Sequence, residues 1–335
     1  MTCMKEEDIR KRDVFNKYLE LAKEDVKRFF SDKPSFVSVN CPACDGSEFR
    51  FEFDKEGFKY VSCNSCSTLF VNPRPSFKDL NYFYTSSNAM HFLINDFFKP
   101  VEESRRDKIF KPRAEYIHGI FSGKAPGLIG DIGAGFGIFL EELKKTWPLA
   151  KSIAIEPSPE QADICRSKGL DVQCCALEEL KGFEGQFDLL TAFELLEHLF
   201  DPSDFLNRVR SILKPGGYLL ITTLNGQGFD IQLLWERSKS LNPPHHLNFL
   251  NPHSIPLLLE RCGFQTVQVS TPGRLDWDIV EGMIKNENVS IGKFWDLLAD
   301  KTGEDCKRGL QDWITKNNLS SHMMLLARKQ ELEKR

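Results

Sequence analysis

The 335-residue sequence lacks the features that mark several large classes of protein. It has no run of 18 apolar residues, which is about the length that a membrane-spanning helix needs. Its first 15 residues lack the apolar core of a signal peptide. The 44 basic and 48 acidic side chains are interspersed and leave a net charge of only −4. We therefore expect a cytoplasmic protein with no membrane partner and no charged surface for nucleic acid.

The sequence also lacks a disulfide framework, although it contains ten cysteines. Six of them show no regular spacing, which suits a reducing compartment. The other four, Cys41, Cys44, Cys63 and Cys66, form two C-x-x-C pairs separated by 18 residues. This spacing is typical of tetrahedral zinc sites. Four thiolates leave no open coordination position, so the sequence predicts a structural Zn²⁺ and no catalytic metal.

Around the cysteine pairs, the sequence predicts a small β zinc ribbon. Alternating apolar residues between the pairs, from Phe49 to Phe53 and again from Phe58, indicate a hairpin. The ribbon has the aromatic side chains that nucleic-acid binding uses, but four basic residues against five acidic ones from 41 to 75. Nucleic acid is therefore a disfavoured partner.

The patterns divide the chain into four parts. Residues 1–34 carry a helical stripe of apolar residues, which favours a helix that packs on its own protein over one that binds a partner. The ribbon occupies 35–76. Residues 77–124 form an aromatic-rich linker and a leading helix, which would act as a packing layer or as a cap over a site. Residues 125–335 alternate strand and helix, with a helical insertion at about 271–321 that would be a lid or a dimer surface.

The last part opens with a glycine-rich turn. An apolar run ends at Asp131 and is followed by Gly133, Gly135 and Gly137 and then by an amphipathic helical pattern. Glycines allow positive φ and close approach of a ligand to the backbone, and the helix start behind them offers free N–H groups. A second apolar run ends at Glu156, 19 residues after Gly137. A carboxylate at that strand end is placed to accept hydrogen bonds from ribose hydroxyls.

The glycine spacing distinguishes between nucleoside cofactors. A dinucleotide fingerprint would need a third glycine at position 138, which is Ile138. The pattern D-x-G-x-G-x-G instead resembles motif I of the class I S-adenosylmethionine-dependent methyltransferases. Two later blocks, at 187–198 ending in Glu-His and at 213–221 containing Lys-Pro-Gly-Gly, are similar to the fourth-strand and fifth-strand motifs of that family.

The resemblance implies a fold, a cofactor and a set of cofactor contacts. The fold is α/β, a doubly wound, Rossmann-like seven-stranded methyltransferase sheet, here with an N-terminal helix and the zinc ribbon. The cofactor is S-adenosyl-L-methionine. The family's acidic residue at the adenine edge is missing here, so that contact would rest on backbone and apolar groups. The implied cofactor-binding residues are Asp131, Gly133, Ala134, Gly135, Gly137, Glu156, Pro157, Ala176, Leu177, Phe193 and Glu194.

A methyl acceptor that must lose a proton needs a base of near-neutral pKa, for which histidine is suited. His245 and His246 lie in a Pro-Pro-His-His segment after the fifth strand, and in similar family members this loop borders the acceptor pocket. Adjacent side chains point in different directions, so we expect at most one to act as the base and favour His246. The alternative is that both only hold the loop. His198 is expected to be structural or to face the cofactor.

Three functions are compatible with these patterns. A ribbon followed by a segment like Asn-Pro-Arg-Pro-Ser resembles a bacterial subfamily whose members often act on sugars, which favours methylation of a hydroxyl or carbon of a small, saccharide-linked metabolite. One alternative is an rRNA or tRNA methyltransferase that uses the ribbon to bind RNA. The other is a non-catalytic S-adenosylmethionine-binding protein. The sequence leaves a homo-oligomer open.

Overall fold

The computed structural model describes residues 4–31 and 36–331. Within these residues, seven strands form one mixed sheet in the order β12-β13-β10-β9-β6-β7-β8. Their bounds are β6 Leu128–Ile132, β7 Lys151–Ile155, β8 Asp171–Gln173, β9 Phe187–Phe193, β10 Leu213–Leu224, β12 Phe264–Ser270 and β13 His322–Lys329. This is the seven-stranded sheet that the sequence predicted.

The pairing directions place one end of four strands at a common edge. β6 pairs in parallel with β7 and β9, and β9 pairs in parallel with β10. β13 runs antiparallel to both β10 and β12. The carboxyl ends of β6, β7, β9 and β10 therefore meet at one edge, which is where ligands bind in open α/β sheets.

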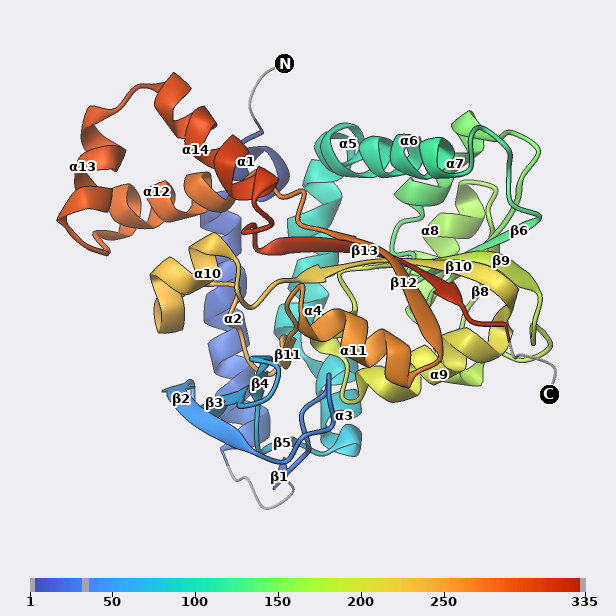
Figure 1. Ribbon diagram of the computed structural model, residues 1–335, viewed down its shortest axis with the longest axis horizontal. Helices are drawn as coiled ribbons and strands as arrows, with labels where there is room; N and C mark the ends of the chain where they lie inside the picture. Colours follow the sequence, from blue (N-terminus) through green and yellow to red (C-terminus); the bar gives the residue numbers. More distant parts are fainter. Residues whose placement is uncertain (1–3, 32–35, 332–335) are drawn as a thin grey trace.

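Helices cover both faces of the sheet, because its central strands are apolar on both sides (Figure 1). One face packs on α6 (Lys111–Ile120), α7 (Ile138–Thr146) and α8 (Pro159–Ser167). The other packs on α9 (Pro202–Ile212) and α11 (Ser254–Arg261). The doubly wound arrangement follows from this burial.

A group of N-terminal helices stands beside the carboxyl end of the sheet (Figure 1). Its members are α1 (Glu6–Ile9), α2 (Arg12–Phe30), α3 (Phe77–Ser86), α4 (Asn88–Phe92), a π-helical turn η1 (Leu93–Phe98), a 3₁₀ turn η2 (Lys99–Val101) and α5 (Glu102–Arg105). A second π-helical turn, η3 (Arg106–Phe110), joins α5 to α6. The stripe on α2 buries Phe15, Tyr18 and Ala22 against Ala89 and Phe97. The helix thus packs on its own protein, as its pattern indicated.

The ribbon is a four-stranded sheet that borrows one strand from the far part of the chain. β2 (Phe49–Lys55), β3 (Phe58–Cys63) and β4 (Leu69–Val71) form a meander, and β11 (Asn248–Phe249) pairs with β4. A separate pair joins β1 (Phe36–Val37) to β5 (Arg74–Pro75). Because β11 follows the histidine segment directly, the ribbon sheet fixes the chain at the end of that segment.

The segment between β12 and β13 is helical, with α12 (Asp276–Glu287), α13 (Lys293–Lys301) and α14 (Glu304–Lys316). These helices pack on α10 (Phe229–Leu234) through Trp277, Val280 and Leu234. In Figure 1 they lie at the end of the molecule opposite the helices α7 and α8. In the described part of the chain, no helix combines the length and the apolarity that crossing a membrane requires.

Candidate functional site

The glycine turn after β6 has the backbone shape that its sequence implied. Gly133, Gly135 and Gly137 all have positive φ, of 68°, 56° and 72°. A Cβ at Gly137 would lie 2.5 Å from Cδ1 of Leu170, so that position also needs glycine for packing. A Cβ at Gly133 or Gly135 would meet no heavy atom closer than 3.6 Å. The turn therefore stays bare at the sheet edge, where a ligand can approach its backbone.

The carboxylate of Glu156 lies directly against this turn. Its Oε2 accepts a hydrogen bond from the Gly135 N–H at 2.7 Å, and its Oε1 accepts one from the Ser158 N–H at 2.9 Å. Only 4% of the residue is exposed, and this burial raises the pKa of Glu156 although both N–H donors oppose the change. Each oxygen keeps a free lone pair, so the carboxylate can still receive two ribose hydroxyls.

Asp131 closes β6 as a second buried carboxylate. Its Oδ1 accepts a hydrogen bond from the Thr191 hydroxyl on β9 at 2.6 Å. Burial raises the pKa of Asp131 to about 7, and the nearby charge of Glu156 contributes, while Thr191 and Arg113 oppose the shift. Asp131 therefore changes its charge near neutral pH.

A charged cluster forms where β9, β10 and β13 meet. Glu194 follows β9 with a φ of 52° and accepts hydrogen bonds from Arg113 Nη2 at 2.9 Å and from the Thr222 hydroxyl at 2.7 Å. His322 Nδ1 lies 3.3 Å from the same carboxylate. Burial alone would raise the pKa of Glu194, but the positive charges and hydrogen bonds outweigh it and lower the pKa to about 2. Arg113 also lies 4.6 Å above the ring of Phe193.

The two adjacent histidines have different surroundings. His245 is 1% exposed, it packs on Tyr18, Phe83 and Tyr84, and neither of its ring nitrogens has a hydrogen-bond partner in the described structure. His246 is half-buried, and its Nδ1 lies 2.6 Å from the carbonyl oxygen of Ser240. A carbonyl only accepts, so Nδ1 carries the proton and Nε2 keeps its lone pair.

Two neighbours support the histidine segment from the sheet side. The ring of His198 lies 4.8 Å from that of His246, and burial lowers the pKa of His198 to about 3. The Leu247 N–H donates to the Glu197 carbonyl at 2.7 Å. Burial and the charge of Glu194 hold the pKa of the Glu197 carboxyl well above its usual value. The His198 ring and the Glu197 carbonyl thus hold the segment near the end of β9.

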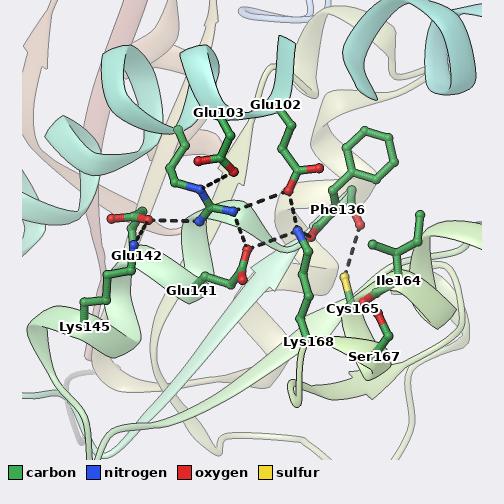
Figure 2. Close-up of polar contacts among 12 residues, drawn as sticks. Glu102, Glu103, Phe136, Glu141, Glu142, Lys145, Ile164, Cys165, Ser167 and Lys168 are labelled. Atoms are coloured by element: carbon green, nitrogen blue, oxygen red, sulfur yellow. Dashed lines mark hydrogen bonds and ion pairs between the residues drawn. The ribbon is translucent and has the colours of Figure 1, made fainter. Parts of the chain in front are cut away.

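An ion-pair network fixes the glycine turn from outside (Figure 2). Lys168 Nζ donates to the Phe136 carbonyl at 2.9 Å, and Cys165 Sγ donates to the Gly135 carbonyl at 3.2 Å. Lys168 also pairs with Glu102 and Glu141, at 2.5 and 3.1 Å. Since Glu102 lies on α5 and Glu141 on α7, the turn is tied to both helices.

The four predicted metal ligands come together in the ribbon. The sulfur atoms of Cys41, Cys44, Cys63 and Cys66 all lie within 4.8 Å of one another. The Cys41–Cys66 and Cys44–Cys63 sulfur pairs are each 3.5 Å apart. A tetrahedral zinc with Zn–S distances of about 2.3 Å needs sulfur atoms about 3.8 Å apart. The residues therefore fit a Zn²⁺ of the closed, structural kind.

Comparisons with known proteins show the family of this chain. A family model described as a methyltransferase domain matches residues 105–269. The ubiquinone biosynthesis O-methyltransferase of Xanthomonas axonopodis pv. citri (strain 306) is 30% identical over 171 residues, which are 47% of this chain and 70% of that protein. The chain belongs to the S-adenosylmethionine-dependent methyltransferases. This methyltransferase binds S-adenosylmethionine, and the glycine turn with Glu156 suits that ligand.

Other similar proteins match stretches of different length in this chain. The ubiquinone biosynthesis O-methyltransferase of Xanthomonas campestris pv. campestris (strain B100) is 27% identical over 215 residues, which are 60% of this chain and 88% of that protein. Among solved structures, a SAM-dependent methyltransferase from Archaeoglobus fulgidus has a TM-score of 0.45 and 21% identity, covering 67% of this chain and 94% of its own. Burkholderia thailandensis 1,6-didemethyltoxoflavin-N1-methyltransferase has a TM-score of 0.47 and 16% identity, covering 84% and 100%.

The other predicted cofactor residues differ in how exposed they are and in how close they lie to the glycine turn. Ala134 lies inside the glycine turn, and its carbonyl accepts from the Gly137 N–H. Pro157 is exposed next to Glu156. Ala176 precedes a 3₁₀ turn, η4 (Leu177–Glu179), but the Leu177 side chain is buried in the core. The contacts of Ala176 and Leu177 with an adenine ring stay a prediction.

Sequence reasoning did not single out Arg113, Thr222 or His322, which surround Glu194. They lie 81, 28 and 128 positions away from it, so no local spacing links them to it. The signal that could have found Arg113 is its place on the helix that leads into the first sheet strand. Its guanidinium is the cation suited to the methionine carboxylate of the cofactor.

Proposed function

We propose that this methyltransferase methylates a hydroxyl group of a small metabolite, with His246 as the general base. The names of the curated relatives, ubiquinone biosynthesis O-methyltransferases, support oxygen as the accepting atom. A carbon next to a carbonyl would need the same base. A saccharide-linked acceptor is the class that we propose to test first, because of the resemblance carried by the ribbon and the segment that follows it.

The observation that carries the proposal is the contrast between the two histidines. The Ser240 carbonyl fixes the proton of His246 on Nδ1, and the half-buried ring keeps Nε2 free to accept a proton. Burial lowers the pKa of His246, partly offset by Ser240 and Glu194, so the ring is neutral at pH 7. His245 is enclosed by aromatic rings and has no path for a proton.

In this proposal, some residues bind the cofactor and one residue accepts the proton of the acceptor. The glycine turn and Glu156 hold the nucleoside, and Arg113 holds the methionine carboxylate. Bound S-adenosylmethionine supplies a methyl group activated by its sulfonium. His246 Nε2 takes the hydroxyl proton as the acceptor oxygen gains the methyl group, so the protein mainly provides position and a base.

Two measurements test this function. Incubation of cell extract with the protein and isotope-labelled S-adenosylmethionine should yield a labelled small molecule, and mass spectrometry should locate the label on oxygen. Glu156→Ala should weaken S-adenosylhomocysteine binding by about 1–3 kcal/mol in calorimetry, the cost of a lost hydrogen bond to a charged group. Label on RNA instead of a metabolite would contradict the acceptor class, and unchanged binding would remove Glu156 from the site.

We also propose that the ribbon binds one structural Zn²⁺ through its four cysteines. The clustering of the sulfur atoms and the closed ligand set support this. Elemental analysis of the purified protein should give about one zinc per chain. A preparation that keeps its folded ribbon after complete removal of zinc would argue against a structural ion.

A further inference from the structure

Arg105 is the last residue of α5 and Arg106 is the first residue of η3. The two side chains are adjacent in the chain but have opposite surroundings. Arg106 forms ion pairs with Glu102, Glu103, Glu141 and Glu142, at 2.8 to 3.4 Å. Arg105 has no hydrogen bond and no ion pair to any residue in 4–31 or 36–331, although it is only partly exposed. One guanidinium is saturated with carboxylates, and its neighbour has none.

The unpaired side chain lies near Arg113, whose partner Glu194 follows β9. Arg106 anchors the segment to α7, and consecutive helical residues differ by about 100° around the axis, so Arg105 points elsewhere. The guanidinium carbon of Arg105 lies 5.8 Å from the ring centroid of Phe110, and that of Arg113 lies 5.7 Å from the same ring. Arg105 thus shares a ring with Arg113, which holds Glu194 at the end of β9.

Arg105 is the one of three neighbouring arginines that makes no ion pair with a described residue. Arg10 pairs with Glu6 at 2.6 Å, and Arg113 pairs with Glu194 at 2.9 Å. Burial lowers the pKa of Arg105 to about 10, Arg113 and Arg10 lower it further, and the charge of Glu194, which already pairs with Arg113, only partly opposes this, so Arg105 still carries its charge at pH 7. A partly buried cation without a partner is unfavourable unless something else binds it.

The position of the guanidinium suits a planar oxyanion. Its carbon lies 4.2 Å from the ring centroid of Phe98, so the ring supports one face of the group. A stacked guanidinium keeps its N–H edge free for two parallel hydrogen bonds to a carboxylate or a phosphate. The cofactor carries a single carboxylate, for which Arg113 is suited because its charge acts on Asp131 beside the glycine turn, so a second arginine is available for another anion.

We propose that Arg105 binds an anionic group, a phosphate or a carboxylate, of the methyl acceptor. This inference rests on the proposed function, since it takes the carboxyl edge of the sheet as the place where the acceptor meets the cofactor. It narrows the acceptor to metabolites that carry such an oxyanion, and it makes Arg105 a residue that determines specificity.

The test uses the full chain saturated with S-adenosylhomocysteine. Calorimetry measures the binding of inorganic phosphate and, separately, of acetate at constant ionic strength, and the tighter probe distinguishes the two groups. Arg105→Gln should weaken the binding of the preferred anion at least tenfold, and Arg105→Lys should restore part of it. Lys111→Gln removes one charge from an exposed position six residues away and should leave anion binding unchanged.

The outcomes separate this inference from the proposed function. S-adenosylhomocysteine affinity and melting temperature should be the same in Arg105→Gln and the wild type. If the wild type bound neither anion, or if the variant bound the anion as tightly, the inference would fall. A variant that lost S-adenosylhomocysteine binding would assign Arg105 to the cofactor instead. Should the wild type not bind S-adenosylhomocysteine, the proposed function would fail, whereas phosphate binding that depends on Arg105 would still support an anion site.

Discussion

At the scale of single residues, the site contains two carboxylates with opposite pKa shifts. Burial raises the pKa of Asp131 to about 7, while Arg113 and His322 overcome burial at Glu194 and lower its pKa to about 2. Glu194 therefore stays charged at any working pH, and Asp131 does not. Binding of a cation near Asp131 must favour its ionised form, which links cofactor binding to pH.

We expect the affinity for S-adenosylmethionine to fall as the pH drops below 7. The free protein holds a proton on Asp131 there, and the sulfonium and ammonium charges of the ligand must displace it, at a cost of up to about tenfold per pH unit. Calorimetry at pH 6, 7 and 8 in buffers of different ionisation enthalpy should show proton release. Asp131→Asn should remove both the release and the pH dependence; a pH dependence that persisted in this variant would assign it to another group.

The raised pKa of Asp131 also affects the stability of the fold. It favours folding at low pH, whereas ligand binding is favoured at high pH. The folded pKa of Asp131 lies above its unfolded value of 3.8, so the group binds its proton more tightly in the folded protein. Its unfavourable contribution is absent below pH 3.8 and grows as the pH rises toward 7.

If His246 is the base, the rate should fall at acidic pH as its ring takes up a proton. This fall, the acidic limb of the pH profile, should lie at a lower pH than for a free histidine. Burial lowers its pKa below the usual value, so at saturating S-adenosylmethionine kcat should fall only at a pH lower than that at which a free histidine takes up its proton. His246→Gln should reduce kcat about 10²–10⁴-fold and remove the limb while S-adenosylhomocysteine still binds.

The matched comparison for His246 is His245→Phe, which keeps an aromatic ring in an enclosed position. This variant should retain turnover. If it lost activity to the same extent as His246→Gln while remaining folded, the assignment of the base would be wrong.

At the scale of elements, the α5–η3–α6 segment is decisive because it carries Arg113 to the cofactor side and Arg105 beside it. Its attachment to the sheet depends on Arg106, whose side chain is 12% exposed and contacts carboxylates on both α5 and α7. The same carboxylates reach Lys168, which holds the carbonyl of Phe136 in the glycine turn. Helix attachment and turn shape are therefore coupled.

Arg106→Gln should lower the free energy of unfolding by about 1–3 kcal/mol, because Glu102, Glu141 and Glu142 lose the cation that joins them and keep only Lys168 and Lys145. Urea unfolding followed by circular dichroism measures this change. S-adenosylhomocysteine binding should weaken in parallel, since the turn loses part of its support.

The control for Arg106 is Arg166→Gln, which breaks an exposed pair with Asp163. Exposed pairs contribute little to stability, so this variant should unfold like the wild type. If the two variants were equally stable, the network would be only a surface feature.

At the scale of the whole molecule, the ribbon and the methyltransferase sheet form one structure. β11 pairs with β4, the Asn251 amide donates to the Cys66 carbonyl at 3.0 Å, and Arg261 donates to the Ala43 carbonyl at 2.7 Å. Three of the ribbon cysteines belong to the same hydrophobic cluster as the central strands. The strand that completes the ribbon sheet follows the segment of His245 and His246, so the predicted zinc site supports the predicted base.

Cys63→Ser should therefore affect more than the ribbon. From the spacing of the cysteines alone, one would expect zinc loss with an intact downstream domain that still binds cofactor. The shared strand leads us to expect loss of zinc, a single unfolding transition at lower temperature, and weaker methyl transfer because His246 is displaced. Calorimetric melting, zinc content and S-adenosylhomocysteine affinity measure these effects. Two separate transitions with unchanged affinity would show instead that the ribbon folds independently.

The sequence by itself determined the features that depend on neighbours along the chain. The glycine turn needs residues at 133, 135 and 137 that accept positive φ, and Glu156 is placed by the end of a short strand. The cysteine pairs are each set by a knuckle of four residues. A sheet with helices on both faces follows from the alternation of apolar strands and amphipathic helices, which local patterns encode, and its seven strands are what the family resemblance implied.

Only the tertiary structure decided which distant groups meet. Arg113, Thr222 and His322 surround Glu194 because the first turn of α6, the end of β10 and the start of β13 meet at one edge of the sheet, and no spacing in the sequence fixes that meeting. The same holds for β11 in the ribbon sheet and for Arg105, whose lack of a partner depends on the packing of α5. Burial and charge balance are properties of the assembled fold, because they sum contributions from segments far apart along the chain.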